Sequence, residues 1–325
     1  MPEFNVLISA AGRRVALMEI FRKALRILGI NGKLLASDAT ELAPAFQSAD
    51  RGFLVPFARD PEFAPRMLEI CKQEHVKLVI PTNDHELPVY AKEKGRFSDA
   101  GTVVAISSAN TIQIGRDKIA TSAWLSENGF PTVWQASVDE VLKSNHEWDY
   151  PLVVKPRFGS ASLGVSKVRD EAELRMATRD GEFVVQSLAS GNEHTVDVLL
   201  NRNGKCLCAV PRRRLEIRAG EVSKGMTVRE PTLQNLACEI AESLPGAYGV
   251  LNIQIFHNAA TGELAVIEIN PRFGGGYPLS WEAGAHYPVW MIQEILGKPS
   301  LANADAWRDR LVMLRYDNAV FVDKS

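Results

Sequence analysis

One carboxylate and two side-chain amides lie close together in the last third of the chain, where they could hold a metal ion. Residues 265–277 read AVIEINPRFGGGY, and the apolar alternation predicts a strand on which Glu268 and Asn270 share a face. The preceding apolar run, 250–256, carries Gln254 on its polar face. Oxygen donors on a rigid sheet suit Mg²⁺, which usually keeps waters and binds substrate phosphates. We therefore predict a magnesium site; a half-exposed strand with a polar outer face is the alternative.

The turn between these two strands decides which side chains face each other. A three-residue loop over 260–262 ends in a glycine, which can adopt the left-handed conformation that such loops need. This loop places Gln254 opposite Glu268, and it places Asn252 opposite Asn270. A slip of one residue would put the polar side chains on opposite faces. Turn chemistry and polar pattern therefore favour the same register.

A lysine and a glycine-rich loop form a second candidate site. The predicted strand 152–156 contains Lys155, whose charge is costly to bury without an anionic partner. The loop that follows contains Gly159, Ser160 and Gly164 and exposes backbone N–H groups that can contact phosphates. It is not a Walker A loop, because no Gly-Lys-Ser/Thr sequence opens a helix after it. The pattern indicates a phosphate-binding hairpin, with an ordinary surface hairpin as the alternative.

Charged residues at two further places leave two interpretations open. Arg212 and Arg214 share one face of a predicted strand, which is either a charged edge strand that resists aggregation or an anion site completed by Lys224. Asp84 and Glu86 follow a strand at the edge where open α/β sheets bind ligands. Either these acids face a substrate, or Asn83 or Asp84 simply caps the next helix.

The composition is that of an ordinary globular protein. The chain has 325 residues, 46% of them hydrophobic and 23% charged, and a formal net charge of −2. This charge argues against a general nucleic-acid or membrane binder. The four cysteines are few and scattered, and we expect all of them to be reduced thiols. With no signal peptide pattern and no long apolar run, we expect a cytoplasmic location.

The elements that must position these residues alternate between strands and helices. An apolar strand at 5–10, a helix at 15–28, a strand ending at Asp38, a helix near 62–75 and strands at 78–81 and 103–106 predict a small parallel α/β domain. The unit lacks the G-x-G-x-x-G signature of dinucleotide binding. A helix at 118–128, several β runs, a helix at 231–244 and a strand-like tail at 311–322 follow.

In this order, the motifs resemble the ATP-grasp superfamily from about residue 112 to residue 322. The features that carry the resemblance are Gly115-Arg116-Asp117-Lys118, Val154-Lys155-Pro156, the loop 159–164, Gly191-Asn192-Glu193, Asn252-Ile253-Gln254 and Glu268-Ile269-Asn270-Pro271-Arg272. The chain looks similar to the carbamoyl-phosphate synthase large chain and to amino-acid ligases of that type. The implied fold is an N-terminal parallel α/β domain (1–111) and a two-lobed ATP-grasp domain (112–325), with a small lobe at about 116–185 and a large lobe at about 186–325.

The resemblance also implies roles for single residues. Lys118 and Lys155 would contact ATP phosphates, beneath the loop of Gly159, Ser160 and Gly164. The hinge residues Gln186, Ser187, Leu188 and Ala189 would hold adenine, although many relatives carry an acid at the first of these positions, and Glu193 would bind ribose. Gln254, Glu268 and Asn270 would hold one or two Mg²⁺ ions, or Mn²⁺ in their place. Arg272 would steady an acyl-phosphate, and Lys224 is the second predicted catalytic residue.

The implied activity is that of an ATP- and Mg²⁺-dependent carboxylate–amine ligase acting through an acyl-phosphate on a small molecule, such as an amino acid. This chemistry needs in-line placement and charge neutralisation rather than a protein nucleophile, and no Ser-His-Asp or Cys-His set stands out in the sequence. The alternatives are an enzyme that makes carboxyphosphate and carbamate from bicarbonate, and a non-catalytic nucleotide-binding protein. The expected partners are small-molecule substrates, with no nucleic acid or membrane; a homo-oligomer is compatible with the sequence.

Overall fold

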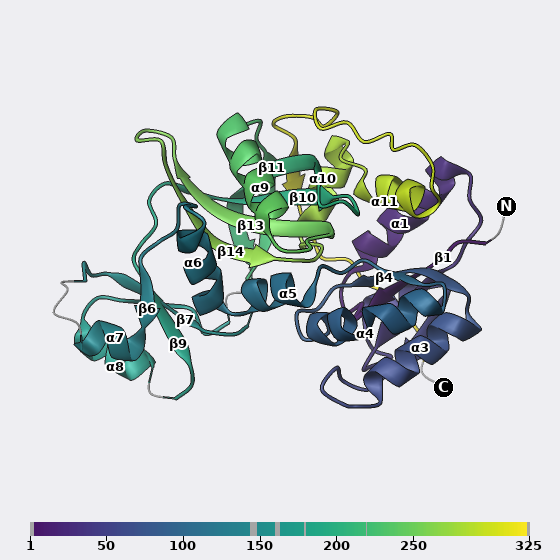
Figure 1. Ribbon diagram of the computed structural model, residues 1–325, viewed down its shortest axis with the longest axis horizontal. Helices are drawn as coiled ribbons and strands as arrows, with labels where there is room; N and C mark the ends of the chain where they lie inside the picture. Colours follow the sequence, from purple (N-terminus) through teal and green to yellow (C-terminus); the bar gives the residue numbers. More distant parts are fainter. Residues whose placement is uncertain (1–2, 144–147, 160–162, 179, 219, 324–325) are drawn as a thin grey trace.

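A computed structural model describes residues 3–143, 148–159, 163–178, 180–218 and 220–323. Within these ranges the chain forms three β-sheets. In Figure 1 the first sheet lies on the right, the second on the left and the third between them in the upper part of the view. None of the helices in the described ranges has the length and apolar composition needed to cross a bilayer.

The first sheet is parallel and covered on both faces. Its strand order is β3-β2-β1-β4-β5. β1 is buried along its whole length because Val6 and Ile8 join the core beneath α1, whereas Leu7 joins the core beneath α3 and α4. The elements are β1 (Asn5–Ser9), α1 (Val15–Leu28), β2 (Leu34–Asp38), α2 (Pro44–Ser48), β3 (Arg51–Leu54), α3 (Phe63–Gln73), β4 (Val76–Pro81), α4 (Leu87–Asp99) and β5 (Val103–Val104). The predicted parallel α/β unit is confirmed.

The second sheet is small and antiparallel, with the order β6-β9-β7-β8. Two helices, α5 (Ala109–Arg116) and α6 (Lys118–Glu127), lead to it. Its elements are β6 (Gln135–Ser137), α7 (Val138–Lys143), β7 (Leu152–Pro156), β8 (Ser166–Val168), α8 (Glu171–Ala177) and β9 (Phe183–Gln186). Val154 and Val185 pack with residues of α7 and α8 on one side, so the opposite face of the sheet remains available to a ligand.

The third sheet is antiparallel and has the order β14-β13-β10-β11-β12-β15. Its core lies against α9, where Val196, Leu251 and Ile253 contact apolar residues of that helix. The elements are β10 (Asn192–Leu200), β11 (Cys206–Arg218), β12 (Glu221–Thr227), α9 (Pro231–Ser243), β13 (Gly249–Asn258), β14 (Glu263–Asn270), α10 (Tyr277–Ala283), α11 (Tyr287–Ile295) and β15 (Val312–Leu314). The predicted tail strand is thus reduced to three residues.

The first sheet and the last helices share one hydrophobic core. Helix α1 packs against α10 and α11, as the right-hand side of Figure 1 shows. Phe21 of α1 meets Phe273 edge to face, with ring centroids 5.9 Å apart. Helix α5 runs through the expected boundary after residue 111, and the division into domains stays a proposal. The shared core holds the N-terminal sheet against the residues that follow β14.

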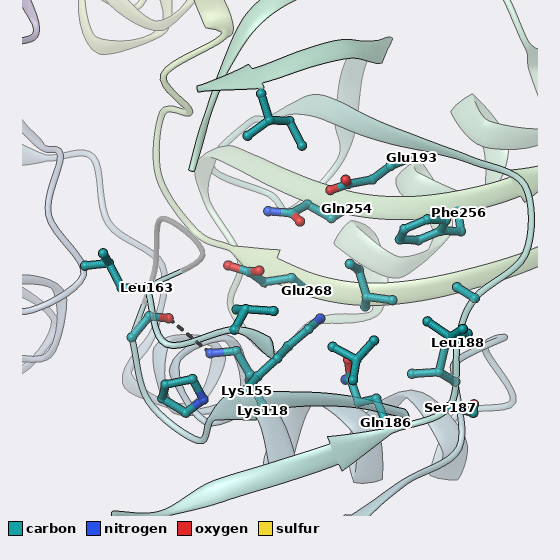
Figure 2. Close-up of a pocket in the computed structure, with 18 of the residues that line it drawn as sticks. Lys118, Lys155, Leu163, Gln186, Ser187, Leu188, Glu193, Gln254, Phe256 and Glu268 are labelled. Atoms are coloured by element: carbon teal, nitrogen blue, oxygen red, sulfur yellow. Dashed lines mark hydrogen bonds between the residues drawn. The ribbon is translucent and has the colours of Figure 1, made fainter. Parts of the chain in front are cut away.

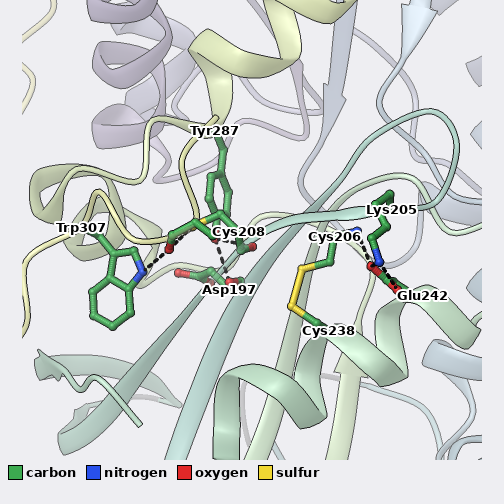
Figure 3. Close-up of a disulfide and its surroundings, with 9 residues drawn as sticks. Asp197, Lys205, Cys206, Cys208, Cys238, Glu242, Tyr287 and Trp307 are labelled. Atoms are coloured by element: carbon green, nitrogen blue, oxygen red, sulfur yellow. Dashed lines mark hydrogen bonds and ion pairs between the residues drawn. A yellow bond between two sulfur atoms is a disulfide. The ribbon is translucent and has the colours of Figure 1, made fainter. Parts of the chain in front are cut away.

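The expectation of four reduced cysteines is wrong for two of them. Cys206 at the start of β11 and Cys238 in α9 form a disulfide with Cα atoms 5.6 Å apart (Figure 3). Cys71 and Cys208 are free and buried. The two paired cysteines are 32 residues apart in sequence, and the packing of α9 on β11 brings them together. Residue spacing alone therefore gave no sign of this pair.

Candidate functional site

A cavity of about 260 Å³ lies between the second and third sheets. Figure 2 shows Lys118 and Lys155 on one side of it and Glu193, Gln254 and Glu268 on the other. The predicted residues that line it are Lys118, Lys155, Gly159, Gln186, Ser187, Leu188, Ala189, Glu193, Gln254 and Glu268. Residues from separate predicted motifs therefore meet around one space.

The two lysines enter the cavity from the junction of β7 and α6. Arg157 anchors this junction, because its guanidinium donates to both Asp117 carboxylate oxygens over 3.0 and 2.7 Å. Lys118 Nζ donates to Gly159 O over 3.1 Å. Lys155 has no hydrogen bond or ion pair within the described ranges, and burial, with the Lys118 charge as a smaller cause, lowers its pKa despite the Glu268 carboxylate. The cavity therefore holds a cation with room for an anionic partner.

A relay of amides orients Gln186 at the hinge end. Gln135 Nε2 donates to Lys118 O over 2.7 Å, so Gln135 Oε1 is left to accept from Gln186 Nε2 over 2.6 Å. The remaining Gln186 Oε1 is then a hydrogen-bond acceptor at the cavity wall. The relay depends on Gln135, which the sequence reading did not single out.

The glycine loop contributes backbone rather than side chains. Gly159 has φ +124° and Gly164 has φ +71°, conformations that favour glycine. A Cβ on Gly164 would lie 2.8 Å from Pro156 Cγ, so the loop returns tightly over the end of β7. Gly159 lines the cavity, whereas Gly164 does not line it directly. The predicted contact residue Ser160 lies outside the described residues.

An arginine that the sequence reading treated as part of a charged strand lies in the cavity wall. Arg214 donates from Nη1 to Glu193 and from Nη2 to Gly220 O. Its Nε is buried without a hydrogen-bond partner among the described residues. Glu193, the predicted ribose ligand, is therefore held by a neighbouring cation. The alternation of Arg212 and Arg214 on one face was the available signal.

The three predicted metal donors lie on paired strands. Gln254 pairs opposite Glu268 in the β13–β14 ladder, in the predicted register. Asn270 Nδ2 donates to Glu268 Oε1 over 3.0 Å, and Asn270 Oδ1 accepts from Arg272 Nη2 over 3.3 Å. Glu268 and Gln254 line the cavity, and Asn270 lies next to them on the same face. The set offers one carboxylate and two amide oxygens, which are donors that Mg²⁺ accepts.

Arg272 links this group to the N-terminal sheet. It donates from Nε and Nη2 to the two carboxylate oxygens of Asp84 over 2.6 and 2.7 Å. Burial lowers the pKa of Arg272, but the Asp84 and Glu268 carboxylates outweigh it and raise the pKa overall. Asp84 therefore forms an ion pair with Arg272, a contact that neither interpretation of this residue included.

Lys224 is not brought to the cavity. Its Nζ lies 2.7 Å from Glu216 Oε2, and both side chains are 49% exposed. The charged-edge interpretation of the arginine strand is also wrong, because β11 is an interior strand between β10 and β12. Arg212 is buried and donates to both carboxylate oxygens of Asp197 over 2.7 and 2.9 Å. That ion pair is part of the core and is not available to a substrate.

The run of three glycines after Arg272 packs closely against polar side chains. A Cβ on Gly274 would lie 2.1 Å from Asn252 Nδ2, and a Cβ on Gly276 would lie 2.1 Å from Arg212 Nη1. Such separations are too short for real Cβ atoms, so only glycine fits. The three glycines therefore let the backbone approach side chains of this protein closely.

Comparisons with known proteins place the chain among characterised families. Residues 6–105 match the family model of the PylC-like N-terminal domain, and residues 115–276 match that of the ATP-grasp domain. The N-terminal section of the carbamoyl phosphate synthase large chain from Methanopyrus kandleri is 26% identical over 294 residues, covering 83% of this chain and 51% of that protein. The large chain from Methanothermobacter thermautotrophicus is 28% identical over 296 residues, covering 83% of this chain but 27% of that protein. The chain thus spans about half or about a quarter of the length of these relatives.

Solved structures share the fold. The biotin carboxylase domain of Hydrogenobacter thermophilus 2-oxoglutarate carboxylase, solved with MgADP and bicarbonate, superposes with a TM-score of 0.73 at 18% identity, covering 96% of this chain and 74% of that one. The N5-carboxyaminoimidazole synthetase of Staphylococcus aureus gives a TM-score of 0.69 at 17% identity, covering 92% and 79%. These structures show the fold, and the two matched family models together with the carbamoyl phosphate synthase relatives show that the chain belongs to the ATP-grasp superfamily.

Proposed function

We propose that this protein is an ATP- and Mg²⁺-dependent carboxylate–amine ligase that releases ADP. The observation that carries the proposal is that Lys155, which has no hydrogen bond or ion pair with any described residue, lines the same cavity as the oxygen donors Glu268 and Gln254. A nucleoside triphosphate with its metal requires a cation for the phosphates and oxygen ligands for the metal, and the two walls offer these groups. A protein that only sensed nucleotide would need no such phosphoryl-transfer arrangement.

In this proposal the nucleotide lies along the cavity with its base at the hinge. Adenine carries an amino group that can donate to Gln186 Oε1, the acceptor left by the amide relay. Backbone groups of Ser187 and Leu188 and the apolar wall around them would complete the base site. The ribose would meet Glu193, and the phosphates would lie between Lys118 and Lys155. The metal-ligand end of the cavity then receives the γ-phosphate.

The donor set fits Mg²⁺ if the nucleotide supplies the remaining ligands. Glu268, Gln254 and Asn270 offer one negative charge among three side chains, so phosphate oxygens and water would supply the remaining ligands. When bound, the ion would neutralise charge on the transferred phosphoryl group. Mn²⁺ instead of Mg²⁺, a homo-oligomer and a cytoplasmic location remain further predictions.

The chemical step would join the acid to the γ-phosphoryl group. A carboxylate oxygen attacks the γ-phosphorus, the bond to the β-phosphate oxygen breaks, and ADP leaves with the acyl-phosphate remaining bound. An amine then attacks the acyl carbon, and inorganic phosphate and a proton are released as the amide forms. In this step the described residues would place the reactants and neutralise charge.

A second candidate is the activation of bicarbonate to carboxyphosphate. Its support is that the relatives include carbamoyl phosphate synthases and that one similar structure was solved with bicarbonate. Both candidates predict ADP, and they differ only in the acid. Bicarbonate dependence in CO₂-depleted buffer separates them.

The test is ADP release from the full chain with Mg²⁺ and pooled carboxylates and amines, with and without added bicarbonate. Release that depends on both pools supports the ligase. Release that depends on bicarbonate alone supports the second candidate. Pyrophosphate and AMP as products, or no turnover and no nucleotide binding, would refute both.

A further inference from the structure

Arg14 is a cation without a partner in the part of the chain that the structure describes. It follows β1 and lies at the start of α1, where its side chain makes no cap hydrogen bond. No ion pair or hydrogen bond joins its guanidinium to a described residue, although the side chain is only partly exposed. Burial lowers the pKa of Arg14, and the nearby Arg272 charge lowers it further. An arginine in this position is stabilised when an anion binds it.

The carboxylates near Arg14 already pair with other arginines. Two carboxylates, Asp84 and Glu221, are near it. Asp84 already pairs with Arg272, and Glu221 Oε2 accepts from Arg315 Nη1 over 2.9 Å. Three arginines thus face two carboxylates, and each carboxylate has its own partner. A carboxylate bound at Arg14 would supply the ion pair that Asp84 gives to Arg272 and Glu221 gives to Arg315.

The topology of the first sheet points to the same position. In the order β3-β2-β1-β4-β5, the connections from β1 and β4 leave in opposite directions. The crevice at the carboxyl ends of these two strands is the place where open α/β sheets bind ligands. Arg14 comes from the connection after β1, and Asp84 comes from the connection after β4. The basic cluster therefore occupies the ligand-binding crevice of the N-terminal sheet.

Arg272 joins this crevice to the metal-ligand end of the cavity. Its charge interacts with Asp84 on the crevice side and with Glu268 on the cavity side. The Gly275 backbone lies at the contact, since a Cβ there would be 2.9 Å from Arg14 Nη1 and 3.2 Å from Glu221 Oε1. An anion held by Arg14 would thus lie near Arg272, which is itself near Glu268 of the cavity.

We propose that Arg14 binds a carboxylate of the acid substrate and that the N-terminal sheet thereby forms one wall of the substrate site. The proposal adds a substrate contact to the ligase function proposed above, and it rests on that function. It names a small carboxylate as the ligand of this cluster and gives Arg272 a positioning role, because Asp84 already occupies its guanidinium. The expected geometry is a bidentate pair between the guanidinium and the carboxylate.

The test measures binding directly, so that it does not depend on turnover. The full chain, saturated with MgADP, is titrated by calorimetry with acetate, succinate, L-aspartate and L-glutamate, and with the amides L-asparagine and L-glutamine as partners of the two amino acids. The variants are Arg14→Ala, Gly275→Ala and the control Arg13→Ala, which removes the same charge from the exposed neighbouring residue. Gly275→Ala keeps Arg14 but pushes its guanidinium aside.

We expect at least one carboxylate to bind the unchanged protein. Arg14→Ala should weaken that binding about 10- to 100-fold, the loss expected for a charge-assisted hydrogen-bonded pair. Gly275→Ala should weaken it in the same direction, and Arg13→Ala should leave it unchanged. The affinity for MgADP should be the same in all four proteins, which shows that each variant is folded.

Three results would overturn the proposal: equal carboxylate affinity with and without Arg14, an equal loss in Arg13→Ala, or no binding of any of the four carboxylates. Failure of the ligase function is a different result. In that case carboxylates still bind through Arg14, but no amine leads to ADP release.

Discussion

Arg272, two residues after the end of β14, and Asp84, in the loop after β4, form a two-pronged ion pair across 188 residues of sequence. The Arg272 side chain is 11% exposed and that of Asp84 is 23% exposed. The pair ties the N-terminal sheet to the strand that carries Glu268 and Asn270. It also occupies the guanidinium that was expected to steady an acyl-phosphate.

Breaking this ion pair should destabilise the protein. Asp84→Asn leaves the Arg272 charge largely buried without its counter-charge, and we expect a loss of about 2–4 kcal/mol in the free energy of unfolding. Urea unfolding followed by tryptophan fluorescence measures it. Adding Arg272→Met should restore part of the loss. The control Asp139→Asn breaks an exposed pair with Lys143 and should change nothing measurable. Equal stability of Asp84→Asn and the unchanged protein would contradict the structural role of the pair.

Glu268 should be required for turnover and not for folding. Glu268→Ala removes the one carboxylate of the predicted metal set, so ADP release should fall at least about 100-fold, as expected when charge neutralisation at the transferred phosphoryl group is lost. Circular dichroism and thermal unfolding should be unchanged. Chelation of Mg²⁺ should have the same effect on the unchanged protein. Normal turnover in the variant would exclude Glu268 as a metal ligand.

The amide relay should determine the preference for adenine. Gln186→Leu removes the acceptor at the hinge, and Gln135→Leu releases the amide that orients it, so each should weaken binding of a non-hydrolysable ATP analogue about three- to tenfold. Discrimination against the corresponding guanine nucleotide should fall as well. Gln113→Leu, at an exposed position of α5, is the control. Unchanged ATP and GTP affinities in both relay variants would remove the hinge from the base site.

Glu86 should make stability depend on pH. Its carboxyl is buried, with Oε2 lacking a hydrogen-bond partner among the described residues, and burial raises its pKa from 4.5 to about 8. Between these values the folded chain holds a proton that the unfolded chain has released. The free energy of unfolding should therefore fall as pH rises, by up to about 1.4 kcal/mol per pH unit, with no further loss from this group above pH 8.

Glu86→Gln should remove this slope, because glutamine does not titrate. Chemical unfolding from pH 5 to pH 9 measures the effect, and Glu69→Gln at a half-exposed site of α3 is the control. Parallel pH profiles for the unchanged protein and Glu86→Gln would show that Glu86 is ionised in the folded state.

The disulfide predicts the number of free thiols. Alkylation of the denatured chain before reduction should modify Cys71 and Cys208 only, and alkylation after reduction should modify all four cysteines. Mass spectrometry of the intact chain distinguishes the two cases. Four alkylated cysteines before reduction would show that Cys206 and Cys238 are thiols.

The hairpin of β13 and β14 shows which features the turn and polar-pattern rules can predict. The register that pairs Gln254 with Glu268 is confirmed, and Gly262 adopts φ +76°. The loop is one residue longer than predicted, because the last pair joins Asn258 to Glu263, and a bulge beside Gln254 and Ile255 offsets the extra residue. The polar pattern and the predicted loop therefore both gave the correct register at Gln254, but neither predicted the longer loop or the bulge.

The sequence by itself determined the elements and the faces on which polar residues stand, because strand and helix periods are local properties of the chain. It grouped Lys155, Glu193, Gln254 and Glu268 through their motifs. Only the tertiary structure decided the partner of each charge. Arg212 pairs with buried Asp197, Lys224 pairs with Glu216 at the surface, and Arg14 forms no ion pair with a described residue. The physical reason is that alternation gives the side of a strand, whereas an ion pair depends on which distant segment packs there.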